Sequence, residues 1–196
     1  MALPDVEKAA FRTQARNQRV AITKQDRKVA SELACQHLID SNLWNTITSI
    51  ALYAAYGSEI DPLQIERQAV KNGKRIFYPR VTGDKLEFAE SNHRDLTKGF
   101  AAILEPTGPP VALSKIDLVI VPGLAFGPQG QRLGSGRGFY DRTLNSDVLT
   151  IGIAFHQQIS SQVPTLPHDV RMKGILTDEG FTLQPSIEVD SELHSE

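Results

Sequence analysis

An apolar run followed by three alternating glycines constrains this chain more than any other feature. Residues 117–121 read Asp-Leu-Val-Ile-Val, and a β-branched run of this kind is typical of a strand buried in a parallel sheet. The dipeptide Pro122-Gly123 ends the run, and glycine then recurs at positions 134, 136 and 138. Alternate glycines let the backbone turn its N–H groups toward one point and let a ligand approach closely. The pattern therefore predicts a strand that leads into a ligand-binding loop.

The residues around these glycines indicate what the loop would bind. Arg132 and Arg137 flank it, and Phe139, Tyr140 and Asp141 follow at once. Backbone donors, guanidinium groups, aromatic rings and a carboxylate together suit a polyphosphate, a flat ring and a metal ion. The spacing matches neither the dinucleotide-binding fingerprint nor the Walker loop. A glycine-rich turn that binds nothing is the alternative interpretation, because such turns are common after strands.

The order of the predicted elements indicates the fold class. Apolar periodicity and capping signals predict helices up to about residue 20, from Thr23, from Asp61-Pro62 to Asn72-Gly73, and over about 138–144. Strands are predicted over residues 47–56, 75–81, 85–90, 116–121, 149–155 and 175–177, with an irregular connection over 92–114. This alternation predicts one α/β domain with a largely parallel sheet, whose ligands bind at the carboxyl ends of the strands. We expect that domain to cover residues 1–183, and a mobile acidic tail to follow over 184–196.

The charge balance and the cysteine count exclude several protein classes. The chain has 196 residues and a formal net charge of −2, but its last thirteen residues hold four acids and no Lys or Arg. The remainder has 21 basic and 19 acidic residues, a balance that suits a local anion site and not a nucleic-acid-binding surface. A single cysteine, Cys35, excludes an intrachain disulfide and a cysteine metal cluster. Without a signal-peptide core or an apolar run near the ~18 residues of a membrane span, we expect a cytoplasmic protein with no membrane partner.

The segment 122–141 resembles the signature of the 5-formyltetrahydrofolate cyclo-ligases, which are also called 5,10-methenyltetrahydrofolate synthetases. The similarity consists of Pro-Gly-Leu-Ala-Phe at 122–126, Gly130, and Arg-Leu-Gly-x-Gly-x-Gly-Phe-Tyr-Asp at 132–141. Further similarities follow in family order at residues 8–12, 53–61, 73–80, 105–106, 158–159 and 168–170. The resemblance therefore extends from about residue 8 to about residue 178.

This resemblance implies a compact three-layer fold with a Rossmann-like sheet, and an ATP-dependent ligase that uses Mg²⁺. Such an enzyme converts 5-formyltetrahydrofolate into 5,10-methenyltetrahydrofolate and releases ADP and phosphate. The formyl oxygen would be phosphorylated, and N10 of the folate would then attack as phosphate leaves. Because phosphoryl transfer depends mainly on positioning and charge neutralisation, no acid–base triad is expected. We expect a monomer that acts on a small molecule.

The resemblance also implies roles for individual residues. ATP is expected to contact Lys8, Arg12, Arg132, Leu133, Gly134, Ser135, Gly136, Arg137, Gly138, Phe139 and Tyr140. The folate is expected to contact Ala54, Glu59, Phe139 and Tyr140, with the Glu59 carboxylate accepting hydrogen bonds from the pterin. Asp141 and Asp169 are expected to bind Mg²⁺ together with phosphate oxygens and water.

Each assignment also has a purely structural alternative. Lys8 and Arg12 lie one helical turn apart and could form a solvated cationic face. Glu59 and Asp141 could stabilise helix amino termini, and the two aromatic residues could be packing residues. Arg19, further along the first helix, has only the interpretation of a solvated surface residue.

The chain departs from the family pattern at four positions. Phe139 stands where a second tyrosine is frequent, Ser135 where some members have a base, Gly127 where Asp is usual, and Lys173 where many have an acid. Phe139, Gly127 and Lys173 leave open a module that binds folate or nucleotide without turnover. A phosphosugar isomerase or a CoA-transferase-like enzyme on a similar sheet is the other alternative. Such an enzyme would need a catalytic acid–base set or a covalent carboxylate, and the sequence does not call for either.

Overall fold

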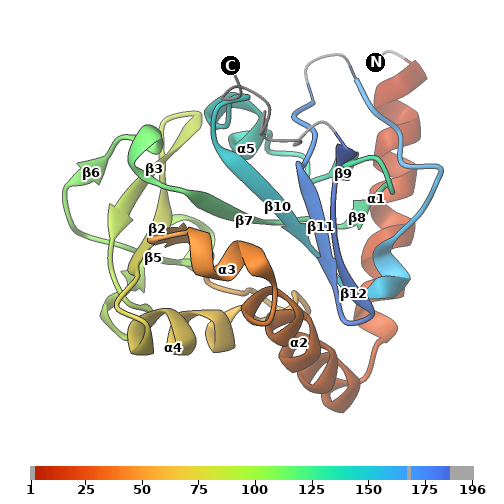
Figure 1. Ribbon diagram of the computed structural model, residues 1–196. Coiled ribbons are helices and arrows are strands. Elements are labelled where there is room, and N and C mark those ends of the chain that lie inside the picture. Colours follow the sequence, from red (N-terminus) through yellow and green to blue (C-terminus); the bar gives the residue numbers. More distant parts are fainter. Residues whose placement is uncertain (1–2, 167–168, 186–196) are drawn as a thin grey trace, which may run out of the picture.

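A computed structural model of the protein describes residues 3–166 and 169–185. An eight-stranded sheet crosses the molecule in the order β12-β11-β10-β7-β1-β2-β3-β6 (Figure 1). Its central strands are parallel: β1 (Ser49–Ala51), β2 (Arg75–Thr82), β7 (Leu118–Pro122), β10 (Leu149–Ile153) and β11 (Gly174–Thr177). Antiparallel strands complete both margins: β3 (Lys85–Glu90), β6 (Pro110–Val111) and β12 (Gly180–Leu183). The predicted α/β class with a largely parallel sheet is confirmed.

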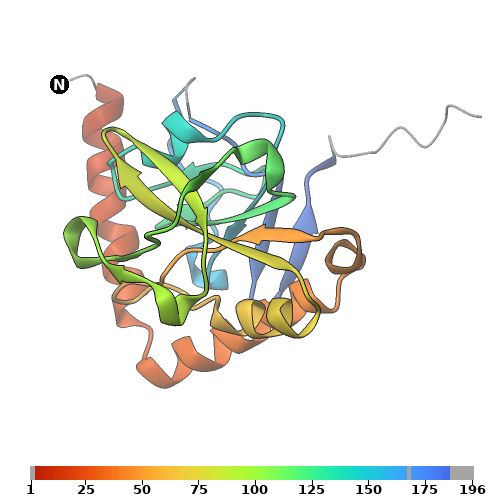
Figure 2. The ribbon, with the colours of Figure 1, turned by 90° about the vertical axis from the view of Figure 1, so that its left-hand side faces the viewer.

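Both faces of the sheet are covered, because alternate residues of each buried strand point in opposite directions. Ile120 of β7 packs in one apolar cluster with residues of α2 (Lys24–Ile39) and α4 (Leu63–Lys71). Val119 and Val121 pack in a second cluster, which includes Tyr140 of α5 (Phe139–Thr143). Helix α1 (Leu3–Ala21) stands at the side of the molecule in both views (Figures 1 and 2). It packs against a small hairpin formed by β8 (Ala125–Phe126) and β9 (Arg132–Leu133).

The ring of Phe126 passes close to two glycines in the second cluster. A Cβ atom on Gly152 of β10 would lie 2.3 Å from that ring, and one on Gly123 would lie 2.6 Å from it. Phe126 itself is fully buried. The two glycines therefore supply the space that lets the β8–β9 hairpin pack directly on the sheet.

The helix predictions agree with the structure at most ends. The Thr23 hydroxyl accepts the backbone N–H of Asp26 at 3.1 Å, as predicted for the start of α2. Asp61 accepts the N–H of Leu63 at 3.0 Å, so α4 begins one residue later than expected. A short helix, α3 (Asn42–Thr46), was not predicted. The strand predicted over 47–56 contains only β1, because the chain leaves the sheet after Leu52, whose N–H still donates to Phe77.

The segment 92–114 is more ordered than the predicted irregular connection. Besides β6 it contains two short strands and three turns of 3₁₀ helix: η1 (His93–Asp95), β4 (Thr97–Lys98), η2 (Phe100–Ala102), β5 (Leu104–Glu105) and η3 (Leu113–Lys115). Strands β4 and β5 pair antiparallel around η2. Elements this short leave no periodic apolar pattern, so the sequence did not predict them.

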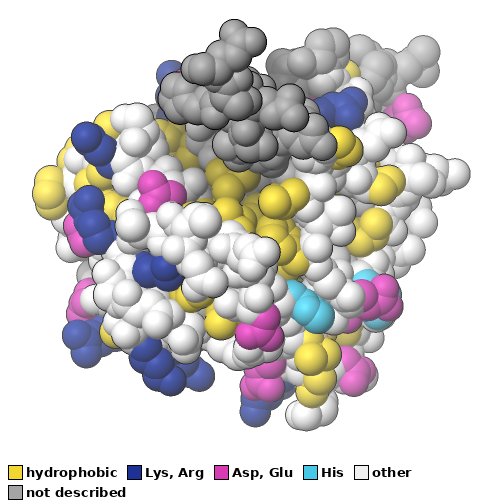
Figure 3. Space-filling model, in the orientation of Figure 1, with side chains coloured by type: hydrophobic (Ala, Val, Ile, Leu, Met, Phe, Trp, Pro, Cys, Tyr) yellow, Lys and Arg dark blue, Asp and Glu magenta, His cyan; other side chains and the backbone are white. Residues whose placement is uncertain are grey.

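The remaining predictions concern the chain end and the surface. Gln184 donates its N–H to the carbonyl of Lys173 at 2.9 Å, and residues 186–196 of the predicted tail lie outside the described residues. Within the two described stretches, no helix combines the length and apolar character needed to cross a membrane. Figure 3 shows hydrophobic side chains across the middle of one face, over the region of β7 and β10, with charged side chains around them.

Candidate active site at the carboxyl ends of the central strands

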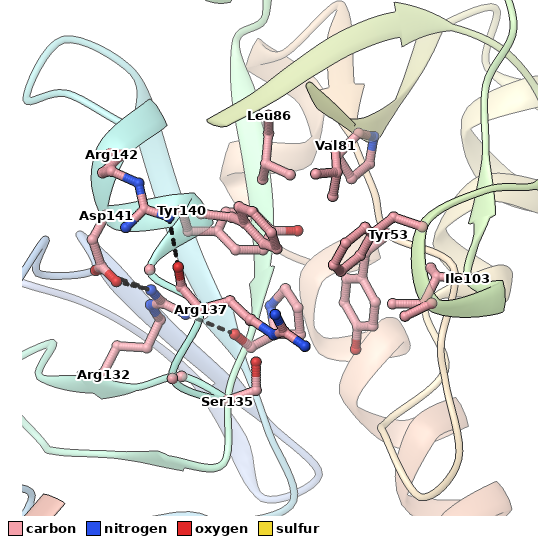
Figure 4. Close-up of a pocket in the computed structure, with 18 of the residues that line it drawn as sticks. Tyr53, Val81, Leu86, Ile103, Arg132, Ser135, Arg137, Tyr140, Asp141 and Arg142 are labelled. Atoms are coloured by element: carbon pink, nitrogen blue, oxygen red, sulfur yellow. Dashed lines mark hydrogen bonds and ion pairs between the residues drawn. The ribbon is translucent and has the colours of Figure 1, made fainter. Parts of the chain in front are cut away.

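A cavity of about 750 Å³ lies where β1 and β7 end, the location predicted for a parallel sheet. Its lining comes from α1, the turn after β1, the β2–β3 hairpin, the 100–105 segment and the 132–142 segment. Figure 4 shows Arg137 and Tyr140 projecting from one side toward Tyr53 and Ile103 on the other. The structure brings all the predicted site residues to this one cavity: Lys8, Arg12, Ala54, Glu59, Arg132, Leu133, Gly134, Ser135, Gly136, Arg137, Gly138, Phe139, Tyr140, Asp141 and Asp169.

Charge is unevenly distributed over the lining of the cavity. Among the described residues, six basic side chains line it, namely Lys8, Arg12, Arg80, Arg132, Arg137 and Arg142. Four acidic side chains of the same part of the chain line it as well, namely Glu59, Glu105, Asp141 and Asp169. The excess of positive charge suits an anionic ligand such as a polyphosphate.

The glycine segment forms an open loop between β9 and α5. Gly136 has φ +101° and Gly138 has φ +68°, conformations that residues with a Cβ atom rarely adopt. Within the described part of the chain, the backbone N–H groups of residues 134–137 donate no hydrogen bond that meets the usual geometry. The loop therefore offers several backbone donors to a ligand in the cavity.

Helix α1 places two cations against this loop and its neighbours. Lys8 Nζ lies 2.5 Å from Asp169 Oδ2, and only 6% of the Lys8 side chain is exposed. Arg12 donates from Nε to the carbonyl oxygen of Gly134 at 3.2 Å. The alternative of a solvated cationic face is therefore wrong for Lys8, whereas Arg12 is half-buried across the glycine loop.

Arg132 is the most buried guanidinium of the cavity, with 4% of its side chain exposed. Its Nη2 atom donates to both Asp141 carboxylate oxygens at 3.0 Å, and its Nη1 atom donates to the carbonyl of Pro122 at 3.3 Å. The guanidinium also lies 5.4 Å from the centre of the Tyr140 ring. Its Nε atom is buried and has no partner among the described residues. Arg132 thus joins the end of β7 to the first turn of α5 and balances the negative charge of Asp141.

The opposite wall carries a half-buried carboxylate, that of Glu59. Glu59 accepts the backbone N–H of Tyr56 at 3.0 Å and pairs with Arg19 Nη1 at 3.7 Å. Burial raises the pKa of Glu59, while the Tyr56 N–H and the Arg19 charge oppose that rise. Arg19 is itself only 9% exposed, so the prediction of a solvated surface residue is wrong for it.

The predicted capping alternative for Glu59 is also not what the structure shows. Asp61, two residues later, provides the carboxylate that accepts an N–H at the start of α4. Glu59 instead contacts its own turn and points its charge toward Arg19. Ala54 lies in the same turn and contributes a small buried surface to the cavity.

Aromatic residues line the cavity between its two walls. Phe139 makes an edge-to-face contact with Phe100, with ring centres 5.6 Å apart and planes at 87°. The Arg137 guanidinium lies 5.5 Å from the centre of the Phe100 ring. Burial raises the pKa of Tyr140, so its hydroxyl stays protonated.

The two residues predicted to bind Mg²⁺, Asp141 and Asp169, are connected through one backbone N–H group. Asp141 Oδ1 accepts the N–H of Val170 at 3.3 Å, and Asp169 is the residue before Val170. Both carboxylates are balanced by a cation, Arg132 in one case and Lys8 in the other. No group of three or more His, Cys, Asp or Glu side chains that could hold a metal is present in residues 3–166 and 169–185. The donors therefore suit Mg²⁺ that keeps water and takes phosphate oxygens, and not a closed protein cage.

Some residues of the cavity were not predicted from the sequence. They are the edge of the β2–β3 hairpin (Arg80, Val81, Leu86), the 100–105 segment, and Arg142. Arg19 was also missed, although residues 8, 12 and 19 follow the spacing of one helix face. Of the four departures from the family pattern, Gly127 and Lys173 do not line the cavity: Gly127 lies in the β8–β9 turn, and Lys173 donates to the carbonyl of Ser146.

Comparison with known proteins assigns the chain to a family. Residues 4–178 match the 5-formyltetrahydrofolate cyclo-ligase family. The chain is 28% identical to 5-formyltetrahydrofolate cyclo-ligase of Mus musculus, over 88% of this chain and 94% of the mouse protein. It is 26% identical to the Escherichia coli K12 protein of the same name, over 83% of this chain and 95% of that protein.

Solved structures agree with this assignment. The 5,10-methenyltetrahydrofolate synthetase of Aquifex aeolicus superposes with a TM-score of 0.80 at 25% identity, over 95% of this chain and 99% of the other. A 5,10-methenyltetrahydrofolate synthetase from Mycoplasma pneumoniae gives a TM-score of 0.72 at 25% identity, over 87% and 98%. A family match over most of the chain and a shared fold lead to one conclusion: this chain belongs to the 5-formyltetrahydrofolate cyclo-ligase family.

Proposed function

We propose that this protein is an enzyme that converts 5-formyltetrahydrofolate into 5,10-methenyltetrahydrofolate, consuming ATP in the presence of Mg²⁺ and releasing ADP and phosphate. The observation that carries the proposal is the presence of two chemically different walls in one cavity. A wall of cations and backbone donors faces a wall with a half-buried carboxylate, and aromatic rings lie between them. That arrangement suits a reaction in which a nucleotide phosphate must meet a flat, nitrogen-rich ring.

The first wall would bind the ATP phosphates. The N–H groups of residues 134–137 and the side chains of Arg12 and Arg137 are the donors best placed for phosphate oxygens. Arg132 and Lys8 already pair with carboxylates. They would therefore bind phosphate through the N–H groups that are not used in those pairs. Such charge-assisted contacts are stronger than neutral hydrogen bonds.

The second wall would bind the folate. A carboxylate can accept two parallel hydrogen bonds from the amino and ring N–H groups of a pterin, and Glu59 is the half-buried carboxylate of this wall. Phe139 and Tyr140 supply ring surfaces for the folate. Phe139 lacks the hydroxyl of the tyrosine frequent at this position, so it would contact the ligand through its ring alone.

The chemistry follows from the poor leaving ability of a formamide oxygen. That oxygen would attack the γ-phosphorus of ATP, and ADP would leave. N10 of the folate would then attack the activated formyl carbon and release its proton to the departing phosphate or to water, and phosphate would leave with the former formyl oxygen. The protein would position the two reactants and neutralise negative charge, which is the main contribution of a protein to phosphoryl transfer.

The metal would lie beside the phosphates. Asp141 and Asp169 would hold Mg²⁺, since both are oxygen donors on the first wall, which is called the phosphate wall below. When bound, Mg²⁺ supplies neutralisation of the phosphate charge. The roles of these two carboxylates stay predictions.

A spectrophotometric assay tests the proposal directly. Purified protein is mixed with 5-formyltetrahydrofolate, ATP and Mg²⁺, and the near-ultraviolet absorbance of the methenyl product is followed while ADP is quantified. We expect one ADP per methenyl product and no reaction when ATP or Mg²⁺ is omitted. Tight folate binding without any absorbance rise would instead identify a binding module. Binding of neither ligand would contradict both functions.

Folate binding is expected to depend on pH through Glu59. Burial raises the pKa of this carboxyl above its usual value, and only the ionised form accepts two hydrogen bonds. The affinity for 5-formyltetrahydrofolate should therefore fall as the pH is lowered, beginning at a higher pH than an exposed glutamate would cause. Isothermal titration between about pH 5 and pH 8 measures this. A Glu59→Gln variant should lose the dependence, and an unchanged profile in that variant would assign the dependence to another group.

A further inference from the structure

Arg19 is a buried cation that the proposed reaction does not yet use. It lies on α1, and its Nε atom donates to Ser58 Oγ at 3.1 Å. Its Nη1 atom donates to the carbonyl of Gly123 at 3.3 Å and lies 3.7 Å from Glu59 Oε1. One guanidinium therefore contacts both the turn that carries Glu59 and the end of β7. Burying a charge is costly unless the charge is paired and hydrogen-bonded, and these three contacts provide that compensation for Arg19.

The contact at Gly123 places Arg19 next to the phosphate wall. Arg132 donates to the carbonyl of Pro122, and Arg19 donates to the carbonyl of the next residue, Gly123. The side-chain amide of Gln158 also donates to the Gly123 carbonyl, at 3.0 Å, and to that of Leu124, at 2.9 Å. Several side chains thus hold the end of β7 in place. Arg19 connects the turn that carries Glu59 to this part of the backbone.

We propose that Arg19 is a positioning residue for Glu59: it holds the Glu59 turn against the end of β7, so that the carboxylate meets the folate at a set distance from the phosphate wall. The inference rests on the proposed function, since it assigns Arg19 a role in folate recognition. Arg19 does not line the cavity, so it would act through Glu59 and not by touching the substrate.

The charges around Glu59 support this role. Among the described residues, Arg19 from α1, Tyr53 from the segment after β1 and Tyr140 from α5 interact electrostatically with Glu59. Both tyrosine hydroxyls have a pKa raised by burial, so they are neutral. Arg19 is therefore the positive charge in this set that opposes the raised pKa of Glu59. Without it, Glu59 would take up a proton at a higher pH.

A pair of variants on the same helix tests the proposal. Arg19→Met removes the charge and keeps an apolar side chain, whereas Arg16→Met makes the same change at an exposed position one turn earlier. We expect Arg19→Met to raise the KM for 5-formyltetrahydrofolate at least about tenfold and the KM for ATP less than about twofold. The acidic limb of the pH profile, which is the range where folate affinity falls as Glu59 takes up a proton, should move to higher pH. Arg16→Met should match the wild type in all three measurements.

A double-mutant cycle separates positioning from a general structural effect. If Arg19 acts through Glu59, Arg19→Met should change the folate KM less than about twofold in a Glu59→Gln background. The same tenfold rise in that background, or equal rises in the KM for folate and for ATP, would overturn the proposal.

Two milder variants keep the test decisive if Arg19→Met folds poorly. Arg19→Lys retains the charge and should restore the position of the acidic limb, with part of the folate affinity. Ser58→Ala removes the acceptor of Arg19 Nε and should raise the folate KM about two- to fivefold. Wild-type kinetics in Ser58→Ala, together with a wild-type folate KM in Arg19→Lys, would refute the inference while leaving the proposed function standing. A wild-type protein that forms no methenyl product would refute the function itself.

Discussion

Glu59→Gln is expected to raise the Kd for 5-formyltetrahydrofolate by roughly 30- to 1,000-fold, which corresponds to about 2–4 kcal/mol for a buried, charge-assisted pair. Glutamine has nearly the same shape, but it offers one acceptor oxygen and an NH₂ group that would face the donors of the pterin. The turn that carries Glu59 should keep its conformation, because its remaining contacts involve backbone groups and Ser58. Isothermal titration with folate and, separately, with an ATP analogue measures the effect.

Glu105→Gln is the matched control for this prediction. Glu105 lines the same cavity, and its Oε1 atom already accepts the N–H of Val81 at 3.1 Å. We expect its substitution to change folate affinity much less than Glu59→Gln does, and neither substitution to alter ATP affinity. Equal losses from the two variants would show that the cavity responds to its total charge and not to a specific contact.

Arg132→Ala is expected to lower the free energy of unfolding by about 3 kcal/mol and to weaken ATP binding at the same time. The reason is the buried pair with Asp141: removing one partner leaves a carboxylate that is only 19% exposed without its cation. The loss of packing against the Tyr140 ring adds to the effect. Urea denaturation measures the stability change, and titration with an ATP analogue measures the affinity.

Two further variants identify the cause of that instability. Arg132→Ala combined with Asp141→Ala removes the unpaired charge and should recover part of the lost stability. Arg137→Ala removes an exposed guanidinium of the same loop, so it should weaken ATP binding with little change in the urea midpoint. If the double variant is no more stable than Arg132→Ala, the loss of stability comes from the void that the missing side chain leaves and not from the unpaired charge of Asp141.

The sequence predicted the sheet from local patterns, and it predicted many of the residues that line the cavity largely through the family resemblance. β-branched runs mark the buried strands β7 and β10, and strand ends of a parallel sheet meet at one edge. The glycine segment predicted a loop, and the structure shows Gly136 and Gly138 in backbone conformations that residues with a Cβ atom rarely adopt. Residues far apart in the chain, such as Lys8 and Asp169, were placed together through the family resemblance, and the structure shows them in contact.

The sequence could not predict which charges neutralise one another. Arg132 and Asp141 were expected to bind different ligand groups, yet they bind each other, because the first turn of α5 returns toward β9. Arg19 was expected to be solvated, because no nearby residue in the sequence indicates that its side chain binds Ser58 and the carbonyl of Gly123. The 100–105 segment was missed for a similar reason: its elements are very short, and its contacts, such as that between Phe100 of η2 and Phe139, are with residues distant in sequence.

The close approach of Phe126 to Gly123 and Gly152 limits how this protein can change over evolutionary time. A single mutation that adds a methyl group at either glycine would collide with the ring, and cores tolerate such overfilling poorly. Shrinking the ring first would open a void, at a cost of about 3–5 kcal/mol for a phenylalanine truncated to alanine. Neither order of single steps is easy, so these three positions should drift together or remain as they are.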